Sequence, residues 1–452
     1  MLKDRLYELG ESVLKVSKAD ETVVVVHGER ARVVRFANSV IHQNTEVRNI
    51  SLYIHVRFGN RAATVYTNAI NDPRDIATAV KRAEELARIS PENPDLPMVA
   101  PADKIETSED AFDELTAEAD PERLIGMAAE LIKGTPEKFD AFGLVSGGSS
   151  EMVLMTSEGF VGYRGVTDAH IKYNPIHDLT EGYLVQQSAK TFRDLSVEAA
   201  LRKAHERAPL VLNPVEAEPG SWTVILEPLA VDELLGFLNW VGLSARSVQE
   251  GRSPLAGKIG EKIFSDLFTL YEDPLNPRGY ITPFDAEGKR RGLIVVIENG
   301  VLKEFAHDSI TAKRDGRESN GCAVSPFSSQ PYFENLRIKE GEQEYEELIE
   351  STERGLLITR FWYSNLVEPR TLTITGMTRD GLFVIENGRI VGSMKNMRYN
   401  VSLLDVFARI TAVSQESELV GNPTWYGEHH IYGSILPTLK VEGFNFASAT
   451  KF

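Results

Sequence analysis

The sequence predicts an α+β fold in which N-terminal and middle sheet-plus-helix domains precede a mainly β C-terminal domain with a few packed helices. Three observations predict it. Several apolar runs alternate with a period of two, which is typical of strands covered on one side. Helical periodicity is confined to a few segments between these runs. Turn-forming and proline-rich stretches divide the chain into an N-terminal domain over 1–102, a middle domain over 103–210 and a C-terminal domain over 211–452.

The first domain shows the order helix, strands, helix. An amphipathic helix is expected over residues 1–18, followed by a β-branched strand, and Asp72 is placed to cap a second helix that ends near residue 89. His27-Gly28-Glu29 predicts a turn between two strands. The expected strands are 22–26, 31–36, 50–58 and 61–67.

The middle domain begins with an acidic connector. Four prolines between Pro91 and Pro101 interrupt regular structure, and residues 103–122 then carry nine acidic side chains against one lysine. An exposed connector explains this charge better than an acidic interaction surface does. A helix over 121–133 then leads into a β-meander. Gly147-Gly148 lacks the lysine and spacing of a phosphate-binding loop, so a hairpin turn is the prediction there.

The C-terminal domain begins with a strand at 222–226 and a helix that opens at Pro228. Leucines and a valine recur along this helix at the spacing of a buried face. Asn299-Gly300 and Asn387-Gly388 are strong hairpin signals. Further short helices are expected at 308–314, 344–353 and 401–413.

Composition excludes several classes of protein. The net charge of −17 argues against broad nucleic-acid binding, which needs clustered Lys and Arg. The chain has no run of 18 apolar residues, and its charged N-terminus lacks the apolar core of a signal peptide. A single cysteine leaves no internal disulfide. We therefore expect a cytoplasmic protein that binds neither nucleic acid nor membrane.

Three local groups are candidates for chemistry. His429 and His430 are the obvious metal candidates, but adjacent residues on a strand point to opposite faces, so one metal does not easily take both. Asp232-Glu233 fits a solvated helix surface better than a general base. Cys322 has no patterned histidine nearby and fits an ordinary loop thiol. No GxSxG motif supports serine hydrolysis.

A series of motifs in the C-terminal half has a recognisable order. Spaced Gly and Ser residues in 250–260 precede the acidic turn of 284–288 and the hairpin of 296–302, and 436–441 forms a last strand. This series resembles the TldD/PmbA family, the peptidases once called modulators of DNA gyrase. Four residues match the pattern that both branches share: Ser253, Gly257, Asp285 and Gly288. They either shape a peptide groove or set backbone turns, and the sequence leaves both open.

The resemblance implies two branches with different chemistry. TldD-type chains carry zinc on an HExxxH helix with a C-terminal Cys, because a catalytic zinc needs about three protein ligands and an open position. PmbA chains, also called TldE, lack these groups. When the HExxxH motif is aligned without gaps from Ser253 and Gly257, its two His positions fall at Gly236 and Val241 and its Glu position at Phe237. The region that corresponds to the C-terminal Cys, residues 423–427, contains no Cys. The chain therefore resembles the PmbA/TldE branch, with no catalytic residue and no metal ligand of its own.

The resemblance implies that this chain is a PmbA/TldE-like subunit of a metallopeptidase complex, which degrades or processes unfolded peptides. Zinc is expected on a TldD-type partner, in a homo- or heterodimeric assembly. Two alternatives stay open: a self-sufficient homodimeric metallopeptidase with relocated ligands such as His429, His430 and a carboxylate, or a non-enzymatic binding protein such as a gyrase modulator. Whether this chain is itself an enzyme is undecided at this point.

Overall fold

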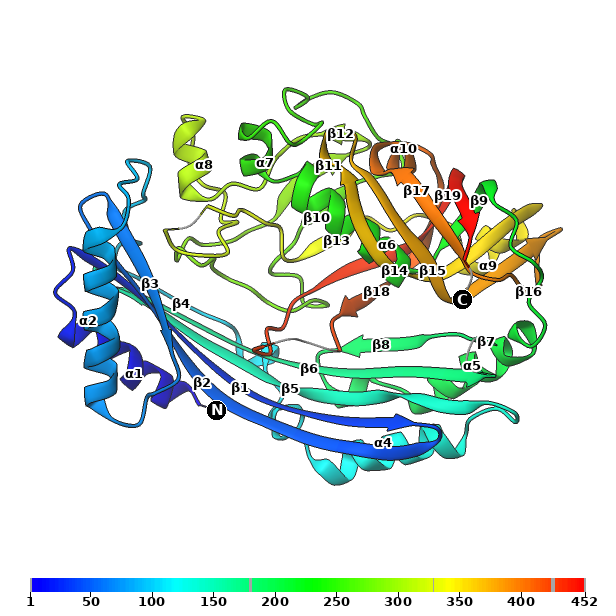
Figure 1. The fold of residues 1–452 in the computed structure, drawn as a ribbon, viewed down its shortest axis with the longest axis horizontal. Coiled ribbons are helices and arrows are strands. Elements are labelled where there is room, and N and C mark those ends of the chain that lie inside the picture. The colour runs from blue at the N-terminus through cyan, green and yellow to red at the C-terminus, as the bar shows by residue number, and fades with distance from the viewer. Residues whose placement is uncertain (1, 179–180, 328, 424–426, 451–452) are drawn as a thin grey trace.

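The computed structural model describes residues 2–178, 181–327, 329–423 and 427–450. Two β-sheets form its two layers (Figure 1). The first sheet has eight strands, ordered β3-β2-β1-β5-β6-β4 with β7 and β8 paired to β6. Its strands are β1 (Glu21–Ala37), β2 (Val40–Phe58), β3 (Arg61–Thr67), β4 (Asp103–Glu106), β5 (Asp140–Thr156), β6 (Phe160–His177), β7 (Glu181–Gly182) and β8 (Val185–Ala189).

Helices cover the outer face of this sheet (Figure 1). On α1, Leu6 and Leu9 are buried in one cluster with Val24 and Val26 of β1. The predicted cap of α2 is confirmed, because the Asp72 carboxylate accepts a hydrogen bond from the backbone N–H of Arg74. These helices are α1 (Lys3–Val16), α2 (Pro73–Ile89), α3 (Glu114–Glu118) and α4 (Pro121–Lys133). Helix α5 (Val197–Val211) lies beside β7 and β8 at the end of the sheet and also contacts the second sheet.

The second sheet has eleven strands and belongs to the C-terminal half. Its order is β12-β11-β10-β13-β19-β17-β15-β14-β9, and β19 also pairs with β18 and β9. The strands are β9 (Gly220–Leu226), β10 (Leu270–Glu272), β11 (Ile294–Glu298), β12 (Val301–Leu302), β13 (Leu336–Ile338), β14 (Arg354–Glu368), β15 (Thr373–Glu386), β16 (Arg389–Ser393), β17 (Met397–Ser402), β18 (Ile410–Gly421) and β19 (Gly433–Ala449).

A few helices pack on the second sheet, as the sequence predicts for a mainly β domain. Helix α6 (Pro228–Phe237) continues into a π-helical turn, Leu238–Gly242, and buries its leucines in the largest apolar cluster. The predicted hairpins are confirmed: Asn299 and Asn387 adopt positive φ angles of 47° and 49° between paired strands. The remaining helices are α7 (Ala245–Gln249), α8 (Ser309–Arg314), α9 (Tyr345–Glu350) and α10 (Leu403–Ala408).

The predicted α+β class is thus confirmed, but three local predictions are wrong. Strand β1 runs through His27-Gly28-Glu29 without a turn, because each residue pairs with both β2 and β5. Gly147-Gly148 lies inside β5 and not in a hairpin turn; a Cβ on Gly148 would lie 2.1 Å from the carbonyl oxygen of Arg30. The helix expected over 401–413 shortens to α10, because β17 and β18 occupy its ends.

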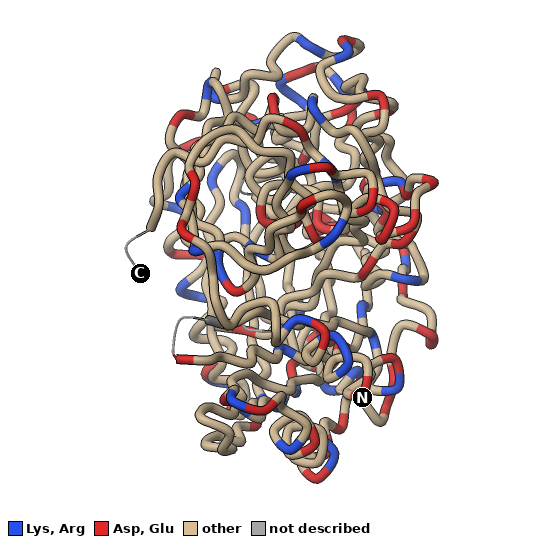
Figure 2. The backbone as a smooth tube through the Cα atoms, turned by 90° about the vertical axis from the view of Figure 1, so that its right-hand side faces the viewer, with Lys and Arg blue, Asp and Glu red and all other residues tan. Residues whose placement is uncertain are grey.

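Strands from the first and second predicted domains form one sheet, since β1 pairs with β5 along fourteen residue pairs from Val23 to Phe36. Pairing alone does not define a folding unit, so the division at residues 102 and 210 stays a prediction. Figure 2 shows acidic and basic positions intermixed along the backbone of both layers. Among the described residues, no helix is long and apolar enough to cross a membrane.

Candidate functional site between the two sheets

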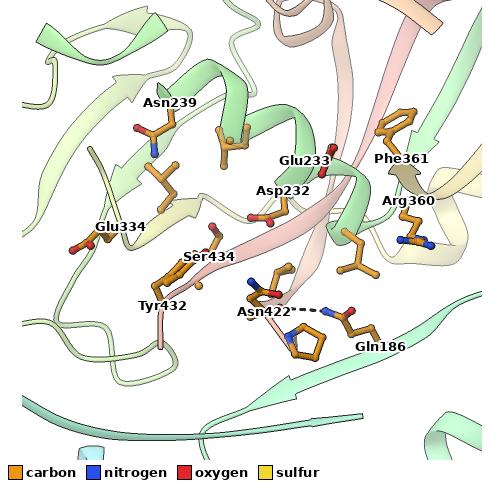
Figure 3. Close-up of a pocket in the computed structure, with 18 of the residues that line it drawn as sticks. Gln186, Asp232, Glu233, Asn239, Glu334, Arg360, Phe361, Asn422, Tyr432 and Ser434 are labelled. Atoms are coloured by element: carbon orange, nitrogen blue, oxygen red, sulfur yellow. Dashed lines mark hydrogen bonds between the residues drawn. The ribbon is translucent and has the colours of Figure 1, made fainter. Parts of the chain in front are cut away.

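A cavity of about 300 Å³ lies beside helix α6, between the C-terminal half and the inner face of the first sheet (Figure 3). Its walls come from strands of both sheets, from α6 and from the segment around residue 422. The polar and charged lining residues are Lys172, Gln186, Asp232, Glu233, Asn239, Tyr332, Glu334, Arg360, Asn422, Tyr432 and Ser434. Because groups of both charges line it, the cavity suits a polar ligand.

Asp232 of α6 is the most perturbed acid in this cavity. Burial raises the pKa of its carboxyl to about 6, a hydrogen bond from Ser434 opposes the rise, and the nearby Glu233 carboxylate adds to it. Asp232 and Glu233 are half-buried, and both line the cavity, so they differ in part from the expected solvated helix surface. A carboxyl with a pKa near neutrality can exchange a proton with a bound group.

Basic groups line the same cavity. Burial lowers the pKa of Lys172 on β6, and the positive charge of Arg360 lowers it further. Arg360 on β14 is paired with Asp380, its Nε lying 2.9 Å from the carboxylate Oδ2. The lining thus combines the Asp232 and Glu233 carboxylates with the Lys172 and Arg360 cations. Such a lining is complementary to groups of both signs, as in a peptide.

Two amide side chains hold the cavity wall in place. Asn239, in the π-helical turn after α6, is buried and donates from Nδ2 to the Phe333 carbonyl over 2.7 Å. Gln186 on β8 donates to the carbonyl oxygen of Gly421 over 3.2 Å, drawn as the dashed line in Figure 3. This second bond joins the first sheet to the end of β18.

A second polar group lies where residues 427–432 contact the inner face of the first sheet. We call His27, Glu428 and His430 the histidine–glutamate cluster. Glu428 Oε2 lies 3.0 Å from His27 Nδ1 and 3.4 Å from His430 Nε2, and it accepts a hydrogen bond from the Tyr53 hydroxyl over 2.8 Å. The rings of His27 and His430 stack with centroids 4.4 Å apart.

Burial has opposite consequences for the two deeper members of this cluster. It lowers the pKa of His27, against the hydrogen bond to Glu428, which favours the charged imidazole. Burial alone would raise the pKa of Glu428, but hydrogen bonds to His27 and His430 bring it below its usual value. The arrangement therefore favours a neutral His27 beside an ionised Glu428.

His429 belongs to a different group, on the other side of the segment. Its Nε2 lies 2.9 Å from Asp168 Oδ2, and His170 Nε2 lies 2.9 Å from the same oxygen. The backbone N–H of His429 donates to Glu29. The two adjacent histidines thus contact different carboxylates, in agreement with the expectation that one metal does not take both.

The four residues matched to the family pattern lie in two separate turns, and none lines the cavity. Ser253 Oγ donates to the Gly242 carbonyl over 2.7 Å, and Gly257 follows at a φ of 76°. The buried Asp285 carboxylate accepts backbone N–H groups of residues 287, 289 and 323, and Gly288 closes that turn at a φ of 82°. These contacts set backbone turns, and a role in shaping a groove stays a prediction.

Cys322 is buried, and burial raises the pKa of its thiol well above the usual value. The effect outweighs the nearby Arg291 cation, which lowers the pKa. A thiol held in its neutral form is a poor nucleophile, in agreement with the interpretation of an ordinary loop thiol. Residues 424–426, in the region compared with the family's C-terminal Cys, lie outside the described residues.

Comparison with known proteins agrees with the motif series. Residues 219–448 match the PmbA/TldA metallopeptidase C-terminal domain. The chain is 25% identical to the metalloprotease PmbA of Escherichia coli O157:H7 over 442 residues, which cover 90% of each chain. It is 39% identical over 120 residues to an uncharacterized protein of Methanocaldococcus jannaschii, and this match spans 29% of that protein. A match to a metalloprotease of Methanothermobacter thermautotrophicus, at 26% identity, spans 49% of that protein, about half its length.

Solved structures show the same fold along the whole chain. TldE from Thermococcus kodakarensis superposes with a TM-score of 0.83 at 21% identity, over 99% of this chain and 100% of that chain. A candidate modulator of a DNA gyrase from Thermotoga maritima gives 0.80 at 21% identity, over 99% of both. At these identities the likeness concerns the fold.

Proposed function

The chain belongs to the PmbA/TldD metallopeptidase family, and from this premise we propose that it is a PmbA/TldE-type subunit of a two-component peptidase. In this proposal a TldD-type partner carries the catalytic zinc. This chain forms part of the wall of a chamber that admits unfolded peptides in the cytoplasm. Similarity to PmbA over 90% of the chain and the TldE fold support it.

The observation that carries the proposal is the chemistry of α6. In the ungapped comparison the two His positions are Gly236 and Val241. A Cβ on Gly236 would meet no atom within 4 Å, whereas Val241 is fully buried in the apolar core. A register shifted by four residues places Asp232, Glu233 and Phe237 at the His, Glu and His positions. Neither register supplies an imidazole.

The described residues around the cavity do not fit a catalytic zinc either. They include carboxylates and amides, but no His and no Cys, among those that line it. A catalytic zinc site in proteins is built mainly from imidazole and thiolate ligands that leave one position open. We therefore assign no step of catalysis to a metal bound at α6. The polar cavity is left with a binding role, in which Asp232 and Lys172 contact a peptide that passes through.

Extended peptides suit such a chamber because a strand edge binds the backbone of any sequence. The interior presents cations and carboxylates on opposing elements, which adds contacts to charged side chains and chain ends without demanding one sequence. Substrates of this kind would be unfolded segments. The assembly would be a heterodimer with the TldD-type chain, or a homodimer in its absence.

Reconstitution tests the proposal. The purified full-length chain should cleave no unfolded peptide such as reduced, denatured casein, and it should co-elute with a TldD-type chain from the same genome. The mixture should cleave the peptide and lose activity with a chelator. Replacing the HExxxH histidines of the TldD-type chain by alanine should abolish this activity. Chelator-sensitive cleavage by this chain alone would contradict the proposal.

One observation favours a second candidate, a self-sufficient metallopeptidase with relocated ligands. His27, Glu428 and His430 bring their ligand atoms within 4.8 Å of one another. In that case cleavage by the isolated chain would disappear in His430→Ala. The partner-subunit proposal expects no activity to lose, so the same assay separates the two candidates.

A further inference from the structure

The histidine–glutamate cluster has the composition of a transition-metal site, and nothing in the helix α6 comparison leads to it. Two imidazoles and one carboxylate are the ligand set that several zinc proteins use. Because β1 supplies one imidazole and the segment before β19 supplies the other two groups, the cluster joins the two ends of the chain. We propose that His27, Glu428 and His430 bind one divalent transition-metal ion of the Zn²⁺ class.

The distances fit such an ion. Zinc bonds to nitrogen and oxygen of about 2.0–2.2 Å in a tetrahedron require ligand atoms about 3.4 Å apart. The two measured separations on Glu428 Oε2 are 3.0 Å to His27 Nδ1 and 3.4 Å to His430 Nε2. All three ligand atoms lie within 4.8 Å of one another. Little movement of Glu428 or His27 is needed to surround an ion.

The groups behind the ligands are those that metal sites use to orient them. The far nitrogen of His27, Nε2, lies 2.8 Å from Ser150 Oγ. With an ion bound, a hydrogen on Nε2 would be donated to Ser150, and the Nδ1 lone pair, no longer hydrogen-bonded to Glu428, would face the ion. The Tyr53 hydroxyl donates to Glu428 Oε2 and fixes the carboxylate. These contacts hold two of the three ligands before any ion arrives.

Glu428 supplies an independent sign of a missing partner. Only 10% of its side chain is exposed, and its second oxygen, Oε1, is buried without a hydrogen-bond partner among the residues that the structure describes. A buried carboxylate oxygen without a partner is costly, and a cation beside it removes the cost. A cation held by the Glu428 carboxylate through Oε2, or through both oxygens, would offset this cost.

His430 is the movable ligand. Its side chain is 57% exposed, and its ring stacks on His27 at an interplanar angle of 24°. Coordination requires the His430 ring to turn out of this stack so that its lone pair and that of His27 point at one ion. The exposure leaves room for this rotation and for a water on the open position. The bound ion would tie residues 427–430 to the first sheet.

Metal uptake by the untagged full-length chain tests the proposal. After treatment with a chelator and its removal, the chain is titrated with ZnCl₂ at neutral pH by calorimetry, and metal content is measured after dialysis. We expect one Zn²⁺ per chain. CoCl₂ should give the visible absorption of a four-coordinate ion with nitrogen ligands, which a merely hydrogen-bonded cluster cannot produce.

Variants locate the site. His430→Ala and the isosteric Glu428→Gln should each weaken Zn²⁺ binding by about 100-fold or more, since each removes one of three ligands. His42→Ala removes an exposed histidine from β2 and should leave uptake unchanged. Circular dichroism of His430→Ala should match the parent chain, because that side chain is mostly exposed.

Two results would overturn the proposal: absence of stoichiometric Zn²⁺ in the parent chain, or unchanged uptake in both His430→Ala and Glu428→Gln. The test is independent of the proposed peptidase role. Reconstitution with a TldD-type chain can fail while this chain still takes up one ion, and the reverse can also occur.

Discussion

Helix α6 and the histidine–glutamate cluster differ in almost every property that matters for metal chemistry. The helix carries leucines toward the core and two carboxylates toward the cavity, and it has no imidazole. The cluster has two imidazoles and one carboxylate, and two of its members, His27 and Glu428, lie 401 residues apart in the sequence. One is a local sequence pattern, and the other exists only because the chain folds back on itself.

This difference separates two uses of polar groups in one interior. Around α6 the apolar face stabilises the domain while Asp232 faces a cavity at some cost in stability. On the inner face of the first sheet, polar groups contact one another: Asp168 Oδ2 contacts His170 on the same strand and His429 from the other layer. Asp168 Oδ1 and Glu428 Oε1 are buried there without a hydrogen-bond partner among the described residues. Neutralising a buried carboxylate should therefore have opposite effects on stability in the two regions.

The largest effect should come from the apolar face of α6. Leu234 is fully buried in the main cluster, so Leu234→Ala should destabilise the chain by about 3–4 kcal/mol through lost burial and a residual cavity. Urea unfolding followed by circular dichroism measures this. The matched control is Leu86→Ala on α2, where the side chain is 39% exposed and the expected loss is small. Equal losses would show that α6 does not anchor the core.

The next effect concerns the polar inner face. Asp168→Asn keeps the shape of the side chain but removes the buried charge that two imidazoles contact, and about 3 kcal/mol of stability should be lost. Urea unfolding at neutral pH is again the measurement. Asp178→Asn, an exposed carboxylate at the end of β6, serves as the control and should be nearly neutral. A neutral Asp168→Asn would mean that the buried group contributes nothing to the docking of residues 427–432.

Asp232→Asn should act in the opposite direction. Burial raises the pKa of Asp232 from 3.8 to about 6, so the folded chain carries a penalty for the charged form above about pH 6. Removing the charge should stabilise the chain by up to about 3 kcal/mol at pH 7.5, at 1.36 kcal/mol per pKa unit. Because the folded state takes up the proton first, this gain should shrink as pH falls from about 6 to about 4. Parallel unfolding curves at pH 7.5 and pH 4 measure it, and a gain that does not depend on pH would contradict a buried charge.

The smallest effect should come from the contact between the regions. Gln186→Ala removes the hydrogen bond to the Gly421 carbonyl, for a loss of about 1 kcal/mol. Hydrogen exchange should quicken locally at the end of β18 before any change in global unfolding is seen. The control is Gln43→Ala: the Gln43 amide donates to Thr45 on the exposed part of β2, so this change should leave exchange at β18 unchanged.

The sequence predicted those parts of the fold that depend on residues close together in the chain. The Asn299-Gly300 and Asn387-Gly388 hairpins, the Asp72 cap and the α6 leucine spacing all act within a few residues. The turn expected at His27-Gly28-Glu29 failed because pairing on both sides of β1 outweighs the preference of one glycine.

The sites were harder to predict for the same physical reason. Asp232 reads as solvated from its helix alone, but its carboxylate lies on a cavity whose walls come from distant parts of the chain. His27 meets Glu428 and His430 across a long stretch of chain, so no spacing in the sequence marks the trio. Alternation along β1, which places His27 and Glu29 on one face, is the one local signal that would have drawn attention to them.

Strand β19 has a consequence for how the chain is made. It forms pairs with β9, β13, β17 and β18, all of which precede it in the chain and are synthesised before it. Until β19 emerges, β9 is paired on one side only, with β14, and its other edge is bare. The nascent C-terminal half then stays exposed to aggregation and to holding chaperones. A truncation that removes the second half of β19, from Val441 onward, should therefore send most of the product to degradation.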